Sequence, residues 1–272
     1  MTHHTPFEGA RVLVTGGGNG LGRLLAAGAA QRGAHVVVWD LSGPRGESTR
    51  DLLRSRGYGA DSAVVDVTDR EAVDRAAAEA GPIDILINCA GVISGRPLME
   101  TTPQSIERTI AVNLSSLFWV TRAFLGGMVD RGHGCVVTVG SASGIMGSAK
   151  MTDYSATKFG GFGFMESLRN ELRLAHTGVR TLIVCPFYMT TGMFEGVKTR
   201  VPLLMPILRP TAVAVKILDG IERGTQQIIL PPFVRIVPLL RLFPPPVIDL
   251  VADVFGINHT MDDFVGRAGD RV

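Results

Sequence analysis

A tyrosine, a lysine and a serine are the residues of this sequence best suited to acid–base chemistry. Tyr154 and Lys158 are four positions apart, close to one helical turn of about 3.6 residues, so on a helix they share a face. A lysine cation held there favours the phenolate and lowers the tyrosine pKa from its usual value of about 10. Ser141, thirteen positions before Tyr154, is placed to hydrogen-bond the same substrate oxygen. Together they predict a centre for alcohol/carbonyl interconversion, although a Y-x-x-x-K pair alone also occurs on ordinary solvated helices.

The composition indicates one folded unit with a large core. The chain has 272 residues, of which 46% are hydrophobic and 19% charged, which is too little charge for disorder. The net charge is +2 without blocks of like charge, so we expect no nucleic-acid partner. Cys89, Cys135 and Cys185 lack metal-site or disulfide spacing, so we expect no metal and a reducing compartment.

The sequence has neither a signal-peptide pattern nor a membrane-spanning apolar run. The first ten residues have no basic-then-apolar signal pattern, and no uninterrupted apolar run reaches about 18 residues. We therefore expect a cytoplasmic protein without a spanning helix.

A glycine-rich turn between a strand and a helix predicts a binding site for a dinucleotide pyrophosphate. Residues 11–15 are a short β-branched run, Gly16 to Gly22 follow, and residues 21–32 have the composition of a helix. Pyrophosphate binds at such a helix N-terminus. Glycines allow the tight turn, and we expect Asn19 to adopt left-handed geometry within it.

The second predicted strand, residues 35–39, indicates which dinucleotide is bound. It ends at Asp40, some 20 residues beyond the glycines, where an acidic residue binds a ribose 2′-hydroxyl. A carboxylate there repels a 2′-phosphate, so NAD is favoured over NADP as the cofactor. Arg45 and Arg50 on the following helix weigh against this preference.

Later strands bring further polar and small residues to the same edge of the sheet, because ligands gather at the carboxyl ends of parallel strands. Residues 62–65 lead to Asp66, which is placed to accept a hydrogen bond from an adenine amino group, and residues 83–87 lead to Asn88-Cys89-Ala90-Gly91. Residues 135–139 lead to Ser141. Asn113 lies in a predicted helix over residues 103–129 and is either a structural polar contact or part of the site.

The alternation of strands and helices predicts the fold. Further strands over residues 181–184 and 226–230 complete a Rossmann-like, doubly wound α/β fold with a seven-stranded parallel sheet and helices on both faces. We expect a single domain over residues 1–272. Its parts are a dinucleotide-binding and catalytic core over 11–191, a substrate lid over 192–210 and a C-terminal extension over 231–272.

The lid and the extension are rich in apolar residues. An apolar lid predicts a lipophilic small-molecule substrate, although ordinary core or a subunit interface explains the same composition equally well. For the extension, three roles stay open: peripheral contact with a membrane, packing across the mouth of the pocket, and packing against a neighbouring subunit.

As a set, these motifs resemble the short-chain dehydrogenase/reductase family. The matching residues are Thr15-Gly16-x-x-x-Gly20-x-Gly22, Asp66, Asn88-Cys89-Ala90-Gly91, Asn113, Ser141, Tyr154-x-x-x-Lys158 and Pro186-Phe187-Tyr188-Met189-Thr190-Thr191. The resemblance implies a catalytic tetrad in which Tyr154 is the acid/base, Ser141 orients the substrate oxygen, Lys158 lowers the tyrosine pKa and Asn113 positions a water. The cofactor contacts expected on this basis are Thr15, Gly16, Gly18, Asn19, Gly20, Leu21, Gly22, Asp40, Leu41, Asp66, Val67, Asn88, Ala90, Gly91, Tyr154, Lys158, Pro186, Met189 and Thr191.

A narrower resemblance covers the segments after the sixth strand. Residues 185–187, 191–196 and 255–264 are similar to the retinol dehydrogenase and 17β-hydroxysteroid dehydrogenase type 11 branch. Members of that branch act on retinoids, sterols and similar long or ring-shaped lipophilic alcohols. The resemblance implies a homodimer or homotetramer that pairs through residues 104–129 and 154–176. The alternatives are an NADPH-dependent carbonyl reductase of similar substrates and a non-catalytic dinucleotide-sensing protein.

Overall fold

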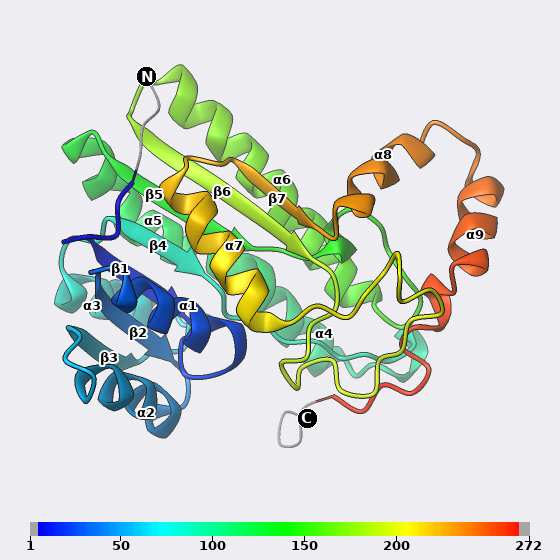
Figure 1. Ribbon diagram of the computed structural model, residues 1–272, viewed down its shortest axis with the longest axis horizontal. Coiled ribbons are helices and arrows are strands. Elements are labelled where there is room, and N and C mark those ends of the chain that lie inside the picture. Colours follow the sequence, from blue (N-terminus) through cyan, green and yellow to red (C-terminus); the bar gives the residue numbers. More distant parts are fainter. Residues whose placement is uncertain (1–4, 267–272) are drawn as a thin grey trace.

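Seven parallel strands form the central sheet, in the order β3-β2-β1-β4-β5-β6-β7 (Figure 1). The structure is a computed structural model and describes residues 5–266. The strand order reverses between β1 and β4, which is where a doubly wound sheet opens a crevice for ligands. The predicted fold is thereby confirmed. The strands are β1 (Arg11–Thr15), β2 (His35–Asp40), β3 (Ala60–Val64), β4 (Ile85–Asn88), β5 (Gly134–Val139), β6 (Val179–Pro186) and β7 (Gln227–Leu230).

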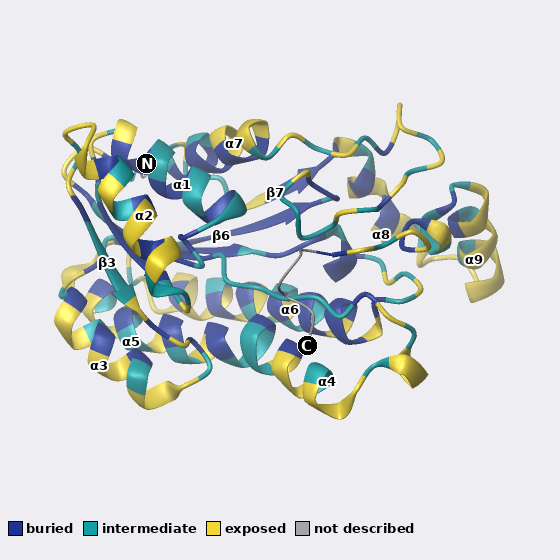
Figure 2. Cartoon of the chain, turned by 90° about the horizontal axis from the view of Figure 1, so that it is seen from below, coloured by how far each residue is buried: buried dark blue, intermediate teal, exposed yellow. Residues whose placement is uncertain are grey.

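Helices cover both faces of this sheet, because its strands are apolar on both sides (Figure 2). One face carries α1 (Gly20–Gln31), α2 (Gly43–Arg54) and α7 (Pro210–Glu222). The other carries α3 (Arg70–Ala80), α4 (Pro103–Ile110), α5 (Ser116–Arg131) and α6 (Thr152–Leu174).

The helix predicted over residues 103–129 is not a continuous α-helix. Helix α4 ends at Ile110, a π-helical turn spans Ala111–Ser115, and α5 then begins at Ser116. The prediction missed this break, because apolar spacing in a sequence does not distinguish a π turn from an α turn. Such turns are frequent at functional sites, and this one holds Asn113.

Beyond β7 the chain forms a separate projection at the carboxyl end of the sheet (Figure 1). It contains the short helices α8 (Val237–Leu240) and α9 (Pro245–Val254). No helix within residues 5–266 is both long and apolar enough to cross a membrane. The last six residues of the predicted extension, 267–272, lie outside the described part of the chain.

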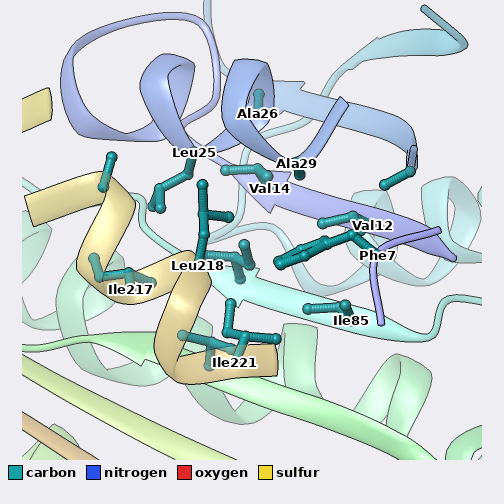
Figure 3. Packing of buried hydrophobic residues seen from close by; sticks show 14 of the residues in the cluster. Phe7, Val12, Val14, Leu25, Ala26, Ala29, Ile85, Ile217, Leu218 and Ile221 are labelled. Atoms are coloured by element: carbon teal, nitrogen blue, oxygen red, sulfur yellow. The ribbon is translucent and has the colours of Figure 1, made fainter. Parts of the chain in front are cut away.

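The core between α1 and α7 shows how closely the helices on one face of the sheet pack. Leu218 of α7 lies against α1 beside Leu25 (Figure 3). A Cβ on Gly28 would overlap the Leu218 side chain, so the glycine permits this close approach. The two helices are therefore joined by tight apolar packing.

We expect Leu218→Ala to lower the free energy of unfolding by about 2 to 5 kcal/mol, because it leaves a cavity between two rigid helices. Leu218 is 2% exposed, whereas Val215 on the same helix is 52% exposed. The matched change Val215→Ala should cost less than about 1 kcal/mol. Denaturant unfolding measures both, and equal losses in the two variants would contradict the packing described.

Candidate active site

A cavity of about 480 Å³ lies along the carboxyl ends of the strands. It extends from the glycine turn after β1 to the first turns of α6. Most of the residues predicted from the sequence line it, so the fold brings them together from segments far apart in the chain. These residues are Gly16, Asn19, Gly20, Leu21, Gly22, Asp40, Leu41, Asp66, Val67, Ala90, Gly91, Ser141, Tyr154, Lys158, Pro186, Met189 and Thr191.

The glycine turn forms a cradle at the N-terminus of α1. Gly16 has a φ of +65°, and a Cβ on Gly22 would overlap the Gly16 carbonyl, so both positions require glycine. Helix α1 has no acidic residue in its first turn, and its first residues, Gly20, Leu21 and Gly22, line the cavity. This cradle fits a pyrophosphate.

Asn19 contributes differently from the way we expected. Its backbone is extended, with a φ of −152°, and not left-handed. The side-chain Oδ1 accepts a hydrogen bond from the N–H of Gly20 at 2.7 Å, so Asn19 is the N-cap of α1. An asparagine is suited to position 19 because it caps the helix that begins at Gly20, and not because the turn needs left-handed geometry.

Asp40 is fixed at the opposite end of the cavity from Tyr154. Its two carboxylate oxygens each accept a hydrogen bond of 2.9 Å from a backbone N–H, one from Gly18 and one from Ser42. Arg45 lines the same end of the cavity. Arg50 does not line it; its guanidinium pairs with Asp51.

Three predicted cofactor contacts lie behind the cavity wall and do not line it. Gly18 supports Asp40, as just described. The hydroxyl of Thr15 accepts hydrogen bonds from the N–H groups of Cys89 and Ala90 at 3.0 and 3.2 Å. The amide of Asn88 donates to the hydroxyl of Thr121 at 3.2 Å. These hydrogen bonds hold the strand ends in place, and contact of the three residues with a cofactor stays a prediction.

Asn113 is a buried clamp beside the catalytic residues. Its Oδ1 accepts from the N–H of Val92 at 2.9 Å, and its Nδ2 donates to the carbonyl of Val92 at 2.8 Å. The second Nδ2 hydrogen is directed to the hydroxyl of Thr157, 3.2 Å away. Both amide hydrogens are thus used, and Asn113 does not line the cavity. The side chain thus has a structural role, and the positioning of a water by Asn113 stays a prediction.

Ser141, Tyr154 and Lys158 meet at the inner end of the cavity, and all three are buried. The Ser141 hydroxyl lies beside the phenol of Tyr154 and acts to lower the pKa of that phenol. The ammonium of Lys158 donates to the carbonyl of Val139 at 3.1 Å and lies 5.4 Å from the centre of the Tyr154 ring. The three groups have the arrangement that the spacing of the sequence predicted.

The protonation of this centre differs from our expectation. Burial raises the pKa of Tyr154, and the Ser141 hydroxyl opposes this rise. Burial also lowers the pKa of Lys158 to about 8. The expected fall of the Tyr154 pKa is therefore not found, because the effect of burial is larger than the opposing effect of Ser141. At neutral pH the phenol holds its proton and is set to donate it.

The cavity wall also contains residues that the sequence reasoning missed. Arg108 and Val112 face it from α4 and the π turn. Helical spacing gave no signal for them, because the π turn changes which side chains share a face. The other missed residues are Trp39, Val65, Thr68, Val92, Val139 and Gly140.

The predicted lid contributes Met193 and Phe194 to the cavity wall, and the motifs quoted from the sequence contribute Cys89 and Phe187. The Phe194 ring meets the Tyr154 ring edge to face, with centres 6.0 Å apart.

We expect Lys158→Met to stabilise the protein without dinucleotide at pH 7 by about 1 to 3 kcal/mol, because it removes a buried charge. The difference in free energy of unfolding between Lys158→Met and wild type should shrink as the pH rises from about 8 to about 10. Over that range the folded wild type has already lost the proton that the unfolded chain still binds, so its own stability rises. Denaturant unfolding across pH measures this, with the exposed Lys216→Met as control. A Lys158→Met variant less stable than wild type at pH 7 would count against a costly buried ammonium.

Comparison with known proteins agrees with this geometry. Residues 10–201 match the family model for short chain dehydrogenases. The chain is 38% identical over 266 residues to epidermal retinol dehydrogenase 2 from Mus musculus, covering 95% of this chain and 86% of that protein. It is 40% identical over 230 residues to retinol dehydrogenase 10-B from Danio rerio, covering 75% and 68%.

Solved structures give the same result. A short-chain dehydrogenase/reductase from Burkholderia phymatum in complex with NAD superposes with a TM-score of 0.78 at 26% identity, over 88% of this chain and 94% of that one. The apo form of LigD from Sphingobium sp. strain SYK-6 gives 0.76 at 30% identity, over 91% and 97%. The resemblance inferred from the sequence is confirmed. The chain belongs to the short-chain dehydrogenase/reductase family, whose members are NAD(P)-dependent oxidoreductases acting on CH–OH groups.

Proposed function

We propose that this protein is an NAD-dependent oxidoreductase that interconverts a lipophilic alcohol and its carbonyl, with Tyr154 as the acid/base. One observation carries the proposal: a single cavity joins the glycine cradle and Asp40 to the buried cluster of Ser141, Tyr154 and Lys158. A dinucleotide lying along it would place its nicotinamide beside the tyrosine, where it supplies or accepts the hydride.

Each residue of the cluster then has a separate task. Tyr154 gives its proton to the substrate oxygen during carbonyl reduction and takes it back during alcohol oxidation. Ser141, which lines the cavity beside the phenol, holds the substrate oxygen in line. Lys158, with a pKa of about 8, is mainly cationic at neutral pH and stabilises the phenolate when it forms. Asn113 keeps the Val92 loop in place beside them.

A lipophilic substrate is supported by the surroundings of Ser141. A small cavity of about 50 Å³ opens beside it and is walled by aromatic and aliphatic side chains, with Phe187, Phe194 and Phe233 among them. Few polar groups are present to recognise a sugar or an acid. The relatives named as retinol dehydrogenases support a retinoid-like, sterol-like or long-chain alcohol.

The proposal also includes where the protein is found and what it contacts. We infer a cytoplasmic protein whose α8–α9 projection contacts a membrane surface, because this projection exposes Leu239, Leu242 and Leu250, with Leu242 82% exposed. We infer a homo-oligomer from the exposed Ile110 and Phe118 on the α4–α5 side. Co-sedimentation with phosphatidylcholine vesicles and analytical ultracentrifugation test these two inferences. A protein that stays monomeric and leaves the vesicles unbound contradicts them.

Turnover of alcohols tests the proposed reaction. Dinucleotide reduction is followed with a panel of apolar primary and secondary alcohols, and we expect NAD-linked oxidation of at least the larger members. Tight dinucleotide binding without turnover of any alcohol would instead support a dinucleotide-sensing protein. Retention of Ser141, Tyr154 and Lys158 in one buried cluster argues against that alternative.

The cofactor preference rests on Asp40, while Arg45 at the same end of the cavity favours the alternative of an NADPH-dependent reductase. We expect wild type to prefer NAD, and Asp40→Ser to shift the ratio of kcat/KM for NAD and NADP towards NADP by about tenfold or more, because a repelling carboxylate is removed. Asp66→Asn is the control, since it should weaken both cofactors and leave the ratio unchanged. A wild type that prefers NADP contradicts the assignment.

A further inference from the structure

The segment that follows α9 returns to the catalytic centre. Residues 257–266, here called the C-terminal strap, run back alongside the lid (Figure 1). They lie beyond the segment over residues 10–201 that matches the family model. The family model therefore does not describe them, although residues 255–264 are similar to the retinol dehydrogenase branch.

The strap fastens the lid. The N–H of Val265 donates to the carbonyl of Glu195 at 2.8 Å, and the N–H of Lys198 donates to the carbonyl of Thr260 at 3.3 Å. The Lys198 ammonium also pairs with Asp263 at 2.7 Å. The lid is thus held by backbone hydrogen bonds to the strap, in addition to its own connections to β6 and α7.

The strap is also tied to the loop that leads into α6. Lys150, four positions before Tyr154, pairs with Asp262 of the strap at 2.7 Å. Lys150 has a φ of +62°, an uncommon conformation for a residue other than glycine. The strap therefore contacts both segments that border the cavity, the lid and the approach to the catalytic helix.

A buried pair of hydroxyl groups makes the third attachment. Tyr188 and Thr260 are both buried, and their oxygens are 2.8 Å apart. The Thr260 hydroxyl donates its single proton to the carbonyl of Ile257 at 2.8 Å. With that proton used, the bond between the two hydroxyls runs from the Tyr188 O–H to the Thr260 oxygen. The Met151 sulfur, 3.3 Å from the same Tyr188 oxygen, is the weaker of the two acceptors for this proton.

Ring contacts link this hydroxyl pair to Tyr154. The rings of Tyr188 and Phe194 meet edge to face with centres 5.1 Å apart, and Phe194 meets Tyr154 in the same manner at 6.0 Å. Met261 of the strap is fully buried in the same cluster. A shift of the strap would consequently move Tyr188 and, through it, Phe194, whose ring contacts that of the acid/base.

The strap borders a cavity on each side of this cluster. Ile257 lines the small apolar cavity beside Ser141. Phe264 lines a second cavity of about 220 Å³ on the other side, and its ring occupies the space that a Cβ on Gly95 would need. The strap thus crosses the region in which an apolar substrate would extend away from the reacting carbon.

We propose that the C-terminal strap is a wall of the substrate chamber and that Thr260, acting through Tyr188, is a positioning residue that sets the width of this chamber. The inference rests on the proposed function, since it concerns the substrate of the same site. It assigns specificity for extended apolar alcohols to the strap, whereas a short alcohol would reach Tyr154 without touching it.

The test compares variants that remove one hydroxyl and keep the shape of the side chain. Thr260→Val and Tyr188→Phe each remove one partner, and Thr260→Ser keeps the hydroxyl. Thr177→Val is the control, because Thr177 also donates to a backbone carbonyl but lies in the turn before β6, at the opposite end of the sheet. Fluorescence titration of NAD-loaded protein with pyrenebutanol measures binding without requiring turnover.

We expect Thr260→Val and Tyr188→Phe each to weaken pyrenebutanol binding about fivefold, and the double variant to lose less than the sum of the two single losses in free energy, because both changes break the one hydrogen bond that the two hydroxyls share. Thr260→Ser and Thr177→Val should bind within about twofold of wild type. The affinity for NAD should be unchanged in every variant. Thr260→Val binding pyrenebutanol like wild type, or additive losses in the double variant, would overturn the proposal.

Kinetics separate this inference from the proposed function. Thr260→Val should lower kcat/KM for decan-2-ol mainly through KM, and should leave kcat/KM for butan-2-ol unchanged. Equal losses for both alcohols would overturn the role of the strap in specificity. Absence of turnover by wild type with either alcohol would overturn the proposed function, while the binding titration would still decide the role of the strap.

Discussion

The catalytic end of this protein depends on the hydrogen bonds of one buried amide. Asn113 pairs with both backbone groups of Val92 and reaches Thr157 of the catalytic helix. Thr157 in turn donates to the carbonyl of Tyr154 at 2.7 Å. The amide therefore joins the loop after β4, the π turn and the first turns of α6. A buried asparagine has to be satisfied in this way, and the π turn is the backbone geometry in which this one does so.

The same region buries two ionisable side chains that its chemistry requires, and this burial is unfavourable for their charged forms. Lys158 is buried with a single described acceptor, the Val139 carbonyl, and burial lowers its pKa to about 8. Tyr154 is buried too and holds its proton more firmly than a free phenol does. The packing of apolar layers on both faces of the sheet, as between α1 and α7, provides the stability that offsets these costs. Stability and function are thus located in different parts of one fold.

Much of the fold and the site could be predicted, because their signals are local in the sequence. Strands with apolar runs, a glycine turn and Asp40 occur in an order that only a doubly wound sheet explains. Contacts between distant segments could not be predicted. Nothing near Thr15 in the sequence indicates that it bonds the N–H of Cys89, and Tyr188 meets Thr260 across 72 positions. The predicted fall of the Tyr154 pKa was wrong for the same reason: burial raises this pKa, and burial is a property of the folded chain.

The central claim is that Tyr154 exchanges the proton while a hydride passes between the substrate carbon and the dinucleotide. Deuterium transfer tests it most directly. Decan-2-ol labelled with deuterium at carbon 2 is incubated with NAD and either wild type or Tyr154→Phe, and the reduced dinucleotide is analysed by mass spectrometry. We predict that wild type transfers one deuterium to the dinucleotide and that Tyr154→Phe, while still binding NAD, transfers almost none. Equal labelling by both proteins would contradict the account.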